Sequence, residues 1–179
     1  MIFQKEDGAI CLTDYDNTLV FPLLVEEIEM LKDDKNYFEN YINLKYMADE
    51  FLPDTPIEKQ YKLYKETKSD LPWLAVWVIV SAKEKTIVGT LDFKNLPDEN
   101  GEIEIGYYVS PSFRRRGFAT SAVKLTCDWA FENGAKKVVA KTDNQNIASK
   151  KVLTNNNFDL KDCNDNLLIF EKSAENNFD

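Results

Sequence analysis

One segment constrains this chain more than any other: an alternating strand that runs through a basic, glycine-containing turn into a helix. It covers residues 104–120 and places the three arginines of 114–116 directly before Gly117. The first turn of a helix leaves backbone N–H groups without intrahelical partners, and the helix dipole adds partial positive charge there. Gly117 lets a ligand approach the backbone, and Ala119 keeps the first turn slim. The segment therefore predicts a cradle for an anion such as a phosphate.

The flanks of this turn have the periodicities of a strand and a helix. Residues 102–109 alternate, which predicts one face with Ile103, Ile105 and Tyr107 and another with Glu102, Glu104 and Gly106. After the turn, apolar residues recur at three-and-four spacing over residues 119–130, and Asn133-Gly134 provides a helix end.

The rest of the chain predicts one domain over residues 1–179, with a core over about 18–172 and a loose polar tail over 173–179. The expected strands are 18–24, 73–81, 86–94, 102–109, 136–143, 158–162 and 166–172. The expected helical stretches are 25–32, 36–51, 57–67, 119–133 and one that opens at Asn146.

The arginine-glycine turn resembles motif A of the GCN5-related N-acetyltransferases (GNAT), written [Arg/Gln]-x-x-Gly-x-[Gly/Ala], with Arg114, Gly117 and Ala119 at the defining positions. The Glu-Ile-Gly-Tyr sequence at 104–107 resembles the fourth strand of the ribosomal-protein and antibiotic acetyltransferase branch. The resemblance implies an α+β fold with α/β/α layers, in which helices flank a mixed, mostly antiparallel sheet of six or seven strands.

A second stretch resembles motif B of the same family. Asn146 and Ser149 open a helix, and Phe158 follows its end in the family's register. The sequence departs from the pattern by carrying Asn157 in place of a glycine, a change that a left-handed turn tolerates. It also has Leu153 where many members carry a tyrosine that acts as general acid.

The resemblance implies transfer of an acetyl group from acetyl-CoA to a primary amine, by direct attack with both substrates bound. It implies Glu104 as the base, and with Leu153 at the tyrosine position, Ser149 or water remains as the acid. No metal site is expected, because the chain has no histidine and its three cysteines lack metal-ligand spacing. The implied cofactor-binding residues are Tyr108, Val109, Arg114, Arg115, Arg116, Gly117, Phe118, Ala119, Thr120, Asn146 and Ser149. Lys150 and Lys151 are either solvated helix charges or contacts for the 3′-phosphate of coenzyme A.

The amino-acid composition excludes some catalytic mechanisms and some classes of binding partner. The chain has no histidine, which removes the Ser-His-Asp triad and every histidine-based metal site. Its 22 basic and 31 acidic residues give a net charge of −9, which argues against a nucleic-acid partner and mildly favours a cationic acceptor. A small amine or a protein N-terminus is the expected acceptor, and a homodimer stays open. With neither a long apolar run nor a signal-like start, we expect a cytoplasmic protein without membrane contact.

Two other functions remain as alternatives. The chain could be a coenzyme A-binding sensor domain without catalysis, which the absence of the tyrosine acid permits. In addition, Asp14 and Asp16 form an Asp-x-Asp-x-Thr motif that resembles the nucleophile loop of haloacid-dehalogenase-type phosphatases. The competing interpretation, which we favour, is an acidic turn at the entrance to a strand.

Overall fold

The computed structural model describes residues 2–4, 10–46, 61–62, 66 and 71–174. The strands are β1 (Ile2–Gln4), β2 (Ile10–Thr13), β3 (Thr18–Pro22), β4 (Lys45–Tyr46), β5 (Val76–Ser81), β6 (Thr86–Phe93), β7 (Glu102–Val109), β8 (Lys137–Asp143), β9 (Asp159–Asn164) and β10 (Leu167–Ser173). The helices are α1 (Val25–Asp33), α2 (Lys35–Ile42), α5 (Leu71–Leu74), α6 (Phe118–Glu132), α7 (Ile147–Asn155) and the short 3-10 helix η1 (Pro111–Phe113).

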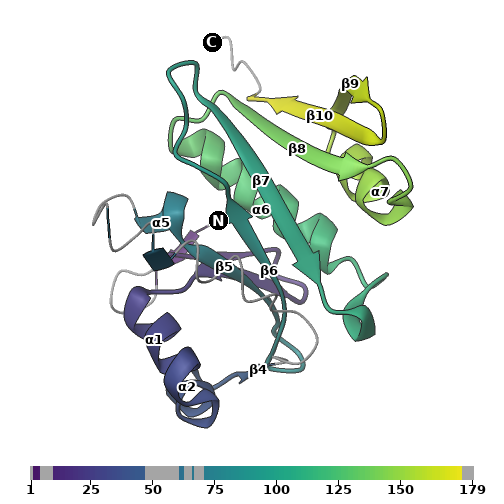
Figure 1. Ribbon diagram of the computed structural model, residues 1–179. Helices are drawn as coiled ribbons and strands as arrows, with labels where there is room; N and C mark the ends of the chain where they lie inside the picture. Colours follow the sequence, from purple (N-terminus) through teal and green to yellow (C-terminus); the bar gives the residue numbers. More distant parts are fainter. Residues whose placement is uncertain (1, 5–9, 47–60, 63–65, 67–70, 175–179) are drawn as a thin grey trace.

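The strands form one sheet in the order β1-β2-β3-β5-β6-β7-β8-β10-β9, with β4 added beside β6 (Figure 1). Neighbouring strands are antiparallel except at two places, where β7 pairs with β8 and β4 pairs with β6 in parallel. The predicted α+β class and mostly antiparallel sheet are confirmed. Within the described residues the sheet has ten strands rather than six or seven, because β1, β2 and β4 are too short to give a clear alternation in the sequence.

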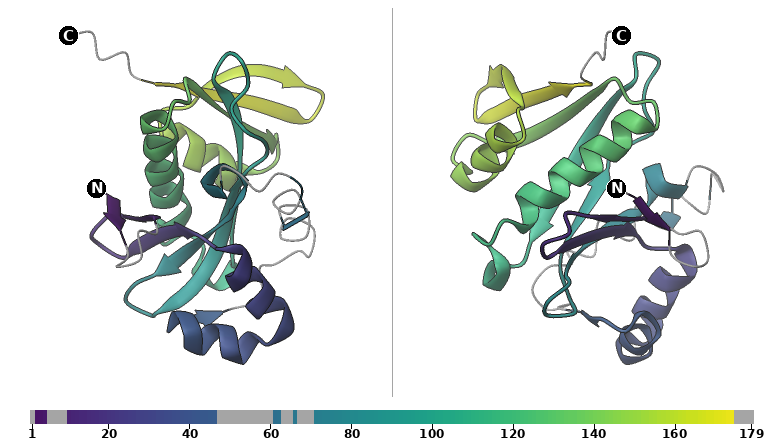
Figure 2. Two further views of the ribbon diagram at one scale, coloured as in Figure 1. Left: turned by 90° about the vertical axis from the view of Figure 1, so that its left-hand side faces the viewer. Right: turned by 180° about the vertical axis from the view of Figure 1, so that it is seen from behind.

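Both faces of the central sheet are covered, and β5 shows this most directly. Trp77 and Ile79 belong to the larger core cluster, which contains the buried side of α6. Val78 and Val80 point to the opposite face and belong to a second cluster with Phe38 of α2. Because successive strand residues face opposite sides, a strand that is apolar at every position is buried on both faces. Figure 2 shows α6 lying across the sheet when the molecule is seen from behind.

The parallel pair β7 and β8 stays together for only three residue pairs. The register runs from Glu102 beside Lys137 to Glu104 beside Val139, and no further pair of these strands follows within the described residues. Each strand continues on its outer side, where β6 pairs with β7 up to Val109 and β10 pairs with β8 up to Asp143. The two strands therefore part in the middle of the sheet, as Figure 1 shows.

Two predicted elements had wrong boundaries. The expected strand over 73–81 begins only at Val76, because Pro72 stands in the first turn of helix α5, where its missing N–H costs nothing. The expected helix over 36–51 ends at Ile42. Asn43 takes a left-handed conformation with φ 55°, which turns the chain toward β4.

The other long elements lie where the sequence predicts them, within a few residues. Of the expected helix over 57–67, the described residues 61, 62 and 66 are helical, and the remainder lies outside the described residues. The same holds for residues 175–179 of the expected tail, whereas Ser173 belongs to β10. Within the described part of the chain, no helix combines the length and apolar character needed to span a bilayer.

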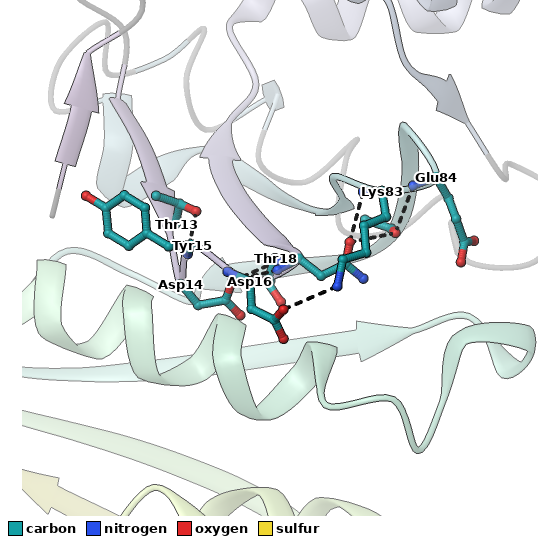
Figure 3. Close-up of polar contacts among 9 residues, drawn as sticks. Thr13, Asp14, Tyr15, Asp16, Thr18, Lys83 and Glu84 are labelled. Atoms are coloured by element: carbon teal, nitrogen blue, oxygen red, sulfur yellow. Dashed lines mark hydrogen bonds and ion pairs between the residues drawn. The ribbon is translucent and has the colours of Figure 1, made fainter.

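The Asp14–Thr18 turn joins β2 to β3, and the carboxylate of Asp14 organises it (Figure 3). Its Oδ1 accepts hydrogen bonds from the backbone amides of Asp16, Asn17 and Thr18, at 3.0, 3.1 and 2.9 Å. Asp16 forms an exposed ion pair with Lys83 of the β5–β6 hairpin, 3.2 Å between Nζ and Oδ1. Burial alone would raise the pKa of Asp14, but hydrogen bonds from Thr18, Ser121 and Asn17 outweigh it and lower the pKa.

This turn predicts a pH-dependent contribution to stability. Replacing Asp14 with Ala removes an acceptor from three amides and should cost about 1–2 kcal/mol of unfolding free energy at pH 7, as the loss of a helix cap does. Because the pKa is lowered on folding, this contribution is present above the ordinary carboxyl pKa and is lost as the pH falls through the lowered value.

The measurement is the melting temperature of the wild type, Asp14→Ala and Asp14→Asn at several pH values. The gap between wild type and Asp14→Ala should shrink on acidification. Asn keeps an accepting oxygen without a charge, so Asp14→Asn should lose less stability than Asp14→Ala. An Asp14→Ala melting curve equal to that of the wild type at pH 7 would contradict the role of the turn.

Candidate functional site

A cavity of about 720 Å³ opens where β7 parts from β8. Its walls come from the end of β7, from the turn before α6, from the first residues of α6 and from α7. The lining residues are Tyr107, Tyr108, Val109, Phe113, Arg114, Arg115, Gly117, Phe118, Ala119, Thr120, Asn146, Ala148, Ser149, Lys151, Val152 and Asn155. The volume is typical of a site for a small-molecule ligand. The structure thus brings together every predicted cofactor-binding residue except Arg116.

The N-terminus of α6 forms the floor of the anion cradle. Gly117 is the N-cap residue with φ 88°, a left-handed conformation that a side chain disfavours. The first intrahelical bond runs from the Ser121 amide to the Gly117 carbonyl, 3.0 Å, so the amides of residues 118–120 precede the helical ladder. A Cβ built on Gly117 would meet no heavy atom within 4 Å, which shows that the space before the helix is open.

Arg114 and Arg115 lie at the pocket, but in different ways. The Nε of Arg114 donates to the Val109 carbonyl, 3.0 Å, and its guanidinium lies 5.4 Å from the centre of the Tyr108 ring. These contacts fix the side chain and leave its terminal N–H groups as donors. Arg115 has φ 61°, which is unusual for a residue with a side chain, and it is exposed. Both add positive charge to the cradle.

Arg116 does not line the pocket. Its guanidinium pairs with the carboxylate of Glu84 in the β5–β6 hairpin. It also lies over the rings of Phe113 and Phe118, 5.0 and 5.4 Å from their centres. Arg116 therefore links the turn to the hairpin, and unlike Arg114 and Arg115 it is not among the residues that line the pocket.

The start of α7 supplies the opposite wall. Asn146 caps the helix, and its Oδ1 accepts from the Ser149 amide at 3.0 Å. Ser149 lines the pocket. Of the two lysines, Lys150 donates to the Asn144 carbonyl at 2.8 Å, whereas Lys151 lines the pocket. Lys151 thus adds an ammonium group to this wall of the pocket.

Tyr107 is a site residue that sequence reasoning missed. Its hydroxyl lies 2.8 Å from Ser149 Oγ, across the gap between β7 and α7. Desolvation by burial raises the pKa of Tyr107 to about 12, against a smaller opposing effect of the bond to Ser149. The alternation of β7 assigned Tyr107 to the core face with Ile103 and Ile105, which is correct. The alternation could not show that this face opens into the pocket.

Glu104, the predicted base, lies on the other face of β7 and is not among the residues that line the pocket. Its Oε2 pairs with Nζ of Lys141 on β8 at 2.6 Å. The Glu104 side chain is 29% exposed and that of Lys141 is 42% exposed. A pair as exposed as this holds its partners weakly, so another ammonium group can exchange with Lys141.

The two positions in and after α7 that depart from the family pattern have clear structural roles. Asn157 takes φ 60° after the helix, as a glycine would, and this confirms that asparagine supports the turn. Leu153 is fully buried in the larger core cluster and contributes no polar group to the site. The Asp14 carboxylate is engaged by turn amides, which supports the interpretation of the Asp-x-Asp motif as a turn.

Comparisons with known proteins identify the family. The family model described as acetyltransferase (GNAT) domain matches residues 28–159, which include β7, the turn before α6, and α7. A curated relative, the uncharacterized N-acetyltransferase YjdG of Bacillus subtilis, is 36% identical over 78 residues. That match covers 43% of this chain and 46% of the relative, so it spans about half of the relative's length.

Solved structures show the same fold at low sequence identity. The ribosomal-protein-S5-alanine acetyltransferase of Vibrio fischeri superposes with a TM-score of 0.64 at 15% identity, covering 92% of this chain and 97% of that one. The microcin C7 self-immunity acetyltransferase MccE, solved with acetyl-CoA and AMP, gives a TM-score of 0.59 at 18% identity, covering 89% and 93%. With the family model matching most of its length and the fold shared throughout, this chain belongs to the GNAT acetyltransferase family.

Proposed function

We propose that this protein is an N-acetyltransferase that moves an acetyl group from acetyl-CoA to a primary amine in a ternary complex. The observation that carries the proposal is the pocket itself. One wall is a helix N-terminus with arginines and an open glycine, and the other wall carries the hydroxyl of Ser149. The pocket can therefore hold the phosphates of a ligand at one wall while the reactive end of that ligand lies near the Ser149 hydroxyl. Catalysis by proximity requires the reactants to be held in this way.

The residues present fit coenzyme A. The amides of residues 118–120, with Arg114 and Arg115, would hold the pyrophosphate, and Lys151 would meet the 3′-phosphate. The inner edge of β7 beyond Glu104 has no β8 pair within the described residues, so an extended amide-bearing arm can pair with it near Val109. The acetyl-CoA in the structural neighbour MccE supports this assignment. When bound, acetyl-CoA supplies the acetyl group as a thioester.

The chain's own groups then have separate tasks. A backbone N–H at the end of β7 would donate to the thioester carbonyl and stabilise negative charge there. Glu104 would first exchange Lys141 for the acceptor ammonium and then accept a proton from it, directly or through water, so that a neutral amine attacks. Ser149 or water assists the departing thiolate. Protein N-termini and small amines are the proposed acceptors, and the ribosomal-protein acetyltransferase among the neighbours supports the first.

Binding is the first test. Acetyl-CoA at a hundred times its Kd should add about 2.7 kcal/mol of stability, measured as a saturable rise in melting temperature. 3′-Dephospho-CoA should shift the melting temperature of the wild type less than coenzyme A does. Coenzyme A and 3′-dephospho-CoA should shift the melting temperature of Lys151→Ala equally, because that variant lacks the side chain proposed to contact the 3′-phosphate. A wild-type melting temperature unaffected by all of these ligands would refute the proposal.

Catalysis by Glu104 is tested by Glu104→Gln, which keeps the shape of the side chain and removes the base. Turnover with a responsive amine should fall by about a hundredfold, since general-base catalysis contributes on that scale. The melting shift with acetyl-CoA should be unchanged. Glu102→Gln is the matched control, because Glu102 shares the sheet face and pairs with Lys137. Equal turnover for Glu104→Gln and Glu102→Gln would rule out the assignment, and binding without any turnover in the wild type would favour the sensor alternative.

Arg116 and Glu84 give a prediction about the turn. Arg116→Ala should weaken acetyl-CoA binding by about two- to fivefold, the scale of an exposed ion pair. Glu84→Ala should weaken it equally, because it breaks the same tie without touching the pocket. Calorimetric titration of both variants measures the effect. If Arg116 instead bound the cofactor directly, removing the Glu84 carboxylate would free it and tighten binding.

A further inference from the structure

The Tyr107–Ser149 bond links the two sides of the gap between β7 and β8. Tyr107 belongs to β7, three residues beyond the last β8 pair, and Ser149 belongs to the first turn of α7, which follows β8. Their hydroxyl oxygens are 2.8 Å apart, and both residues line the pocket. The Ser149 amide is already bound to Asn146, so the backbone that carries this hydroxyl is fixed.

The direction of this bond determines what Ser149 can do. Each hydroxyl has one proton to donate and can accept as well. With its pKa raised to about 12, Tyr107 keeps its proton throughout the range in which an enzyme is assayed. The Ser149 carbonyl lies 3.4 Å from the Tyr107 oxygen, while Ser149 Oγ lies at the optimal O–H···O distance. Either hydroxyl can donate in the Tyr107–Ser149 bond, but of the two acceptors that Ser149 offers to the Tyr107 proton, Oγ is the nearer.

We propose that Tyr107 is a positioning residue that donates its hydroxyl proton to Ser149 Oγ and so leaves the Ser149 proton directed into the pocket, toward the sulfur of coenzyme A. This inference rests on the proposed function and deepens it. It also explains how the site works with Leu153 in place of the family's tyrosine.

The proposed step balances as follows. The amine nitrogen forms a bond to the acetyl carbon, the carbon–sulfur bond breaks, and the sulfur leaves with the electron pair as a thiolate. Ser149 donates a hydrogen bond to that thiolate, and the Tyr107 hydroxyl donates a hydrogen bond to Ser149 Oγ. The thiolate takes its proton from water, and the amine proton leaves through Glu104. A hydrogen bond to the charged form stabilises it and lowers the pKa of the bound thiol.

A binding experiment tests this without an acceptor amine. The affinities of the whole protein for coenzyme A and for its S-methyl thioether are compared by calorimetry as the pH is raised. Because a free thiol has a pKa near 8.5 and the bound thiol should have a lower one, the preference of the wild type for coenzyme A should rise by about tenfold toward high pH. Ser149→Ala should abolish the rise, and Tyr107→Phe should remove most of it.

Kinetics provide a second readout once an amine is found. Tyr107→Phe should lower kcat by about five- to tenfold and leave the KM for acetyl-CoA unchanged. In the Ser149→Ala background, Tyr107→Phe should cause no further loss, because the group it orients is gone. Tyr15→Phe, at an exposed tyrosine in the β2–β3 turn, is the matched control and should match the wild type.

The outcomes are separable. If the preference of the wild type for coenzyme A rises with pH and Tyr107→Phe shows the same rise, the inference is overturned. The proposed function is not affected by that result. The same holds for an equal loss of kcat in both backgrounds, which would mean that Tyr107 merely braces the pocket. A wild type that binds coenzyme A without any rise also overturns it. Failure of the wild type to bind coenzyme A at all refutes the proposed function, and the inference with it.

Discussion

The early end of pairing between β7 and β8 is the constraint on which the site depends. Two neighbouring strands can part only if each is stabilised elsewhere, and here β6 holds one and β10 holds the other. The backbone edges that face the gap become a binding surface, and the helices that follow each strand begin beside it. The cradle of α6 and the hydroxyl of Ser149 therefore meet at one place although some thirty residues separate them along the chain.

Local charge, and not net charge, sets what this gap attracts. The protein is strongly acidic, yet Arg114, Arg115 and Lys151 line the pocket beside a helix N-terminus. Two of the three turn arginines also lie over aromatic rings, which hold them in place. On the opposite sheet face, carboxylates are paired with lysines, as in Glu104 with Lys141 and Asp92 with Lys94. The pocket therefore favours an anion, whereas the carboxylates on the opposite sheet face favour ammonium groups.

Much of this could be predicted because it depends on neighbours in sequence. The alternation of residues 102–109, the helix after Gly117 and the cap at Asn146 are local patterns, and the structure has each of them. The short strands β1, β2 and β4 could not be predicted, since two to four residues carry too little periodicity, and they form strands by pairing with the edge of a neighbouring strand. The prediction of a helix over 36–51 was wrong at its end, because the left-handed Asn43 turns the chain into β4, which pairs with β6.

Turn chemistry and periodicity act over a few residues, so the residue pattern alone predicts the family, the fold class and the glycine turn before α6. Which side chains contact one another depends on the tertiary structure. It paired Arg116 with Glu84 and Glu104 with Lys141, and it placed Tyr107 against Ser149. Each of these contacts joins residues 32 to 42 positions apart. Whether such residues meet depends on how strands are ordered in the sheet and where they part, and no local pattern records that.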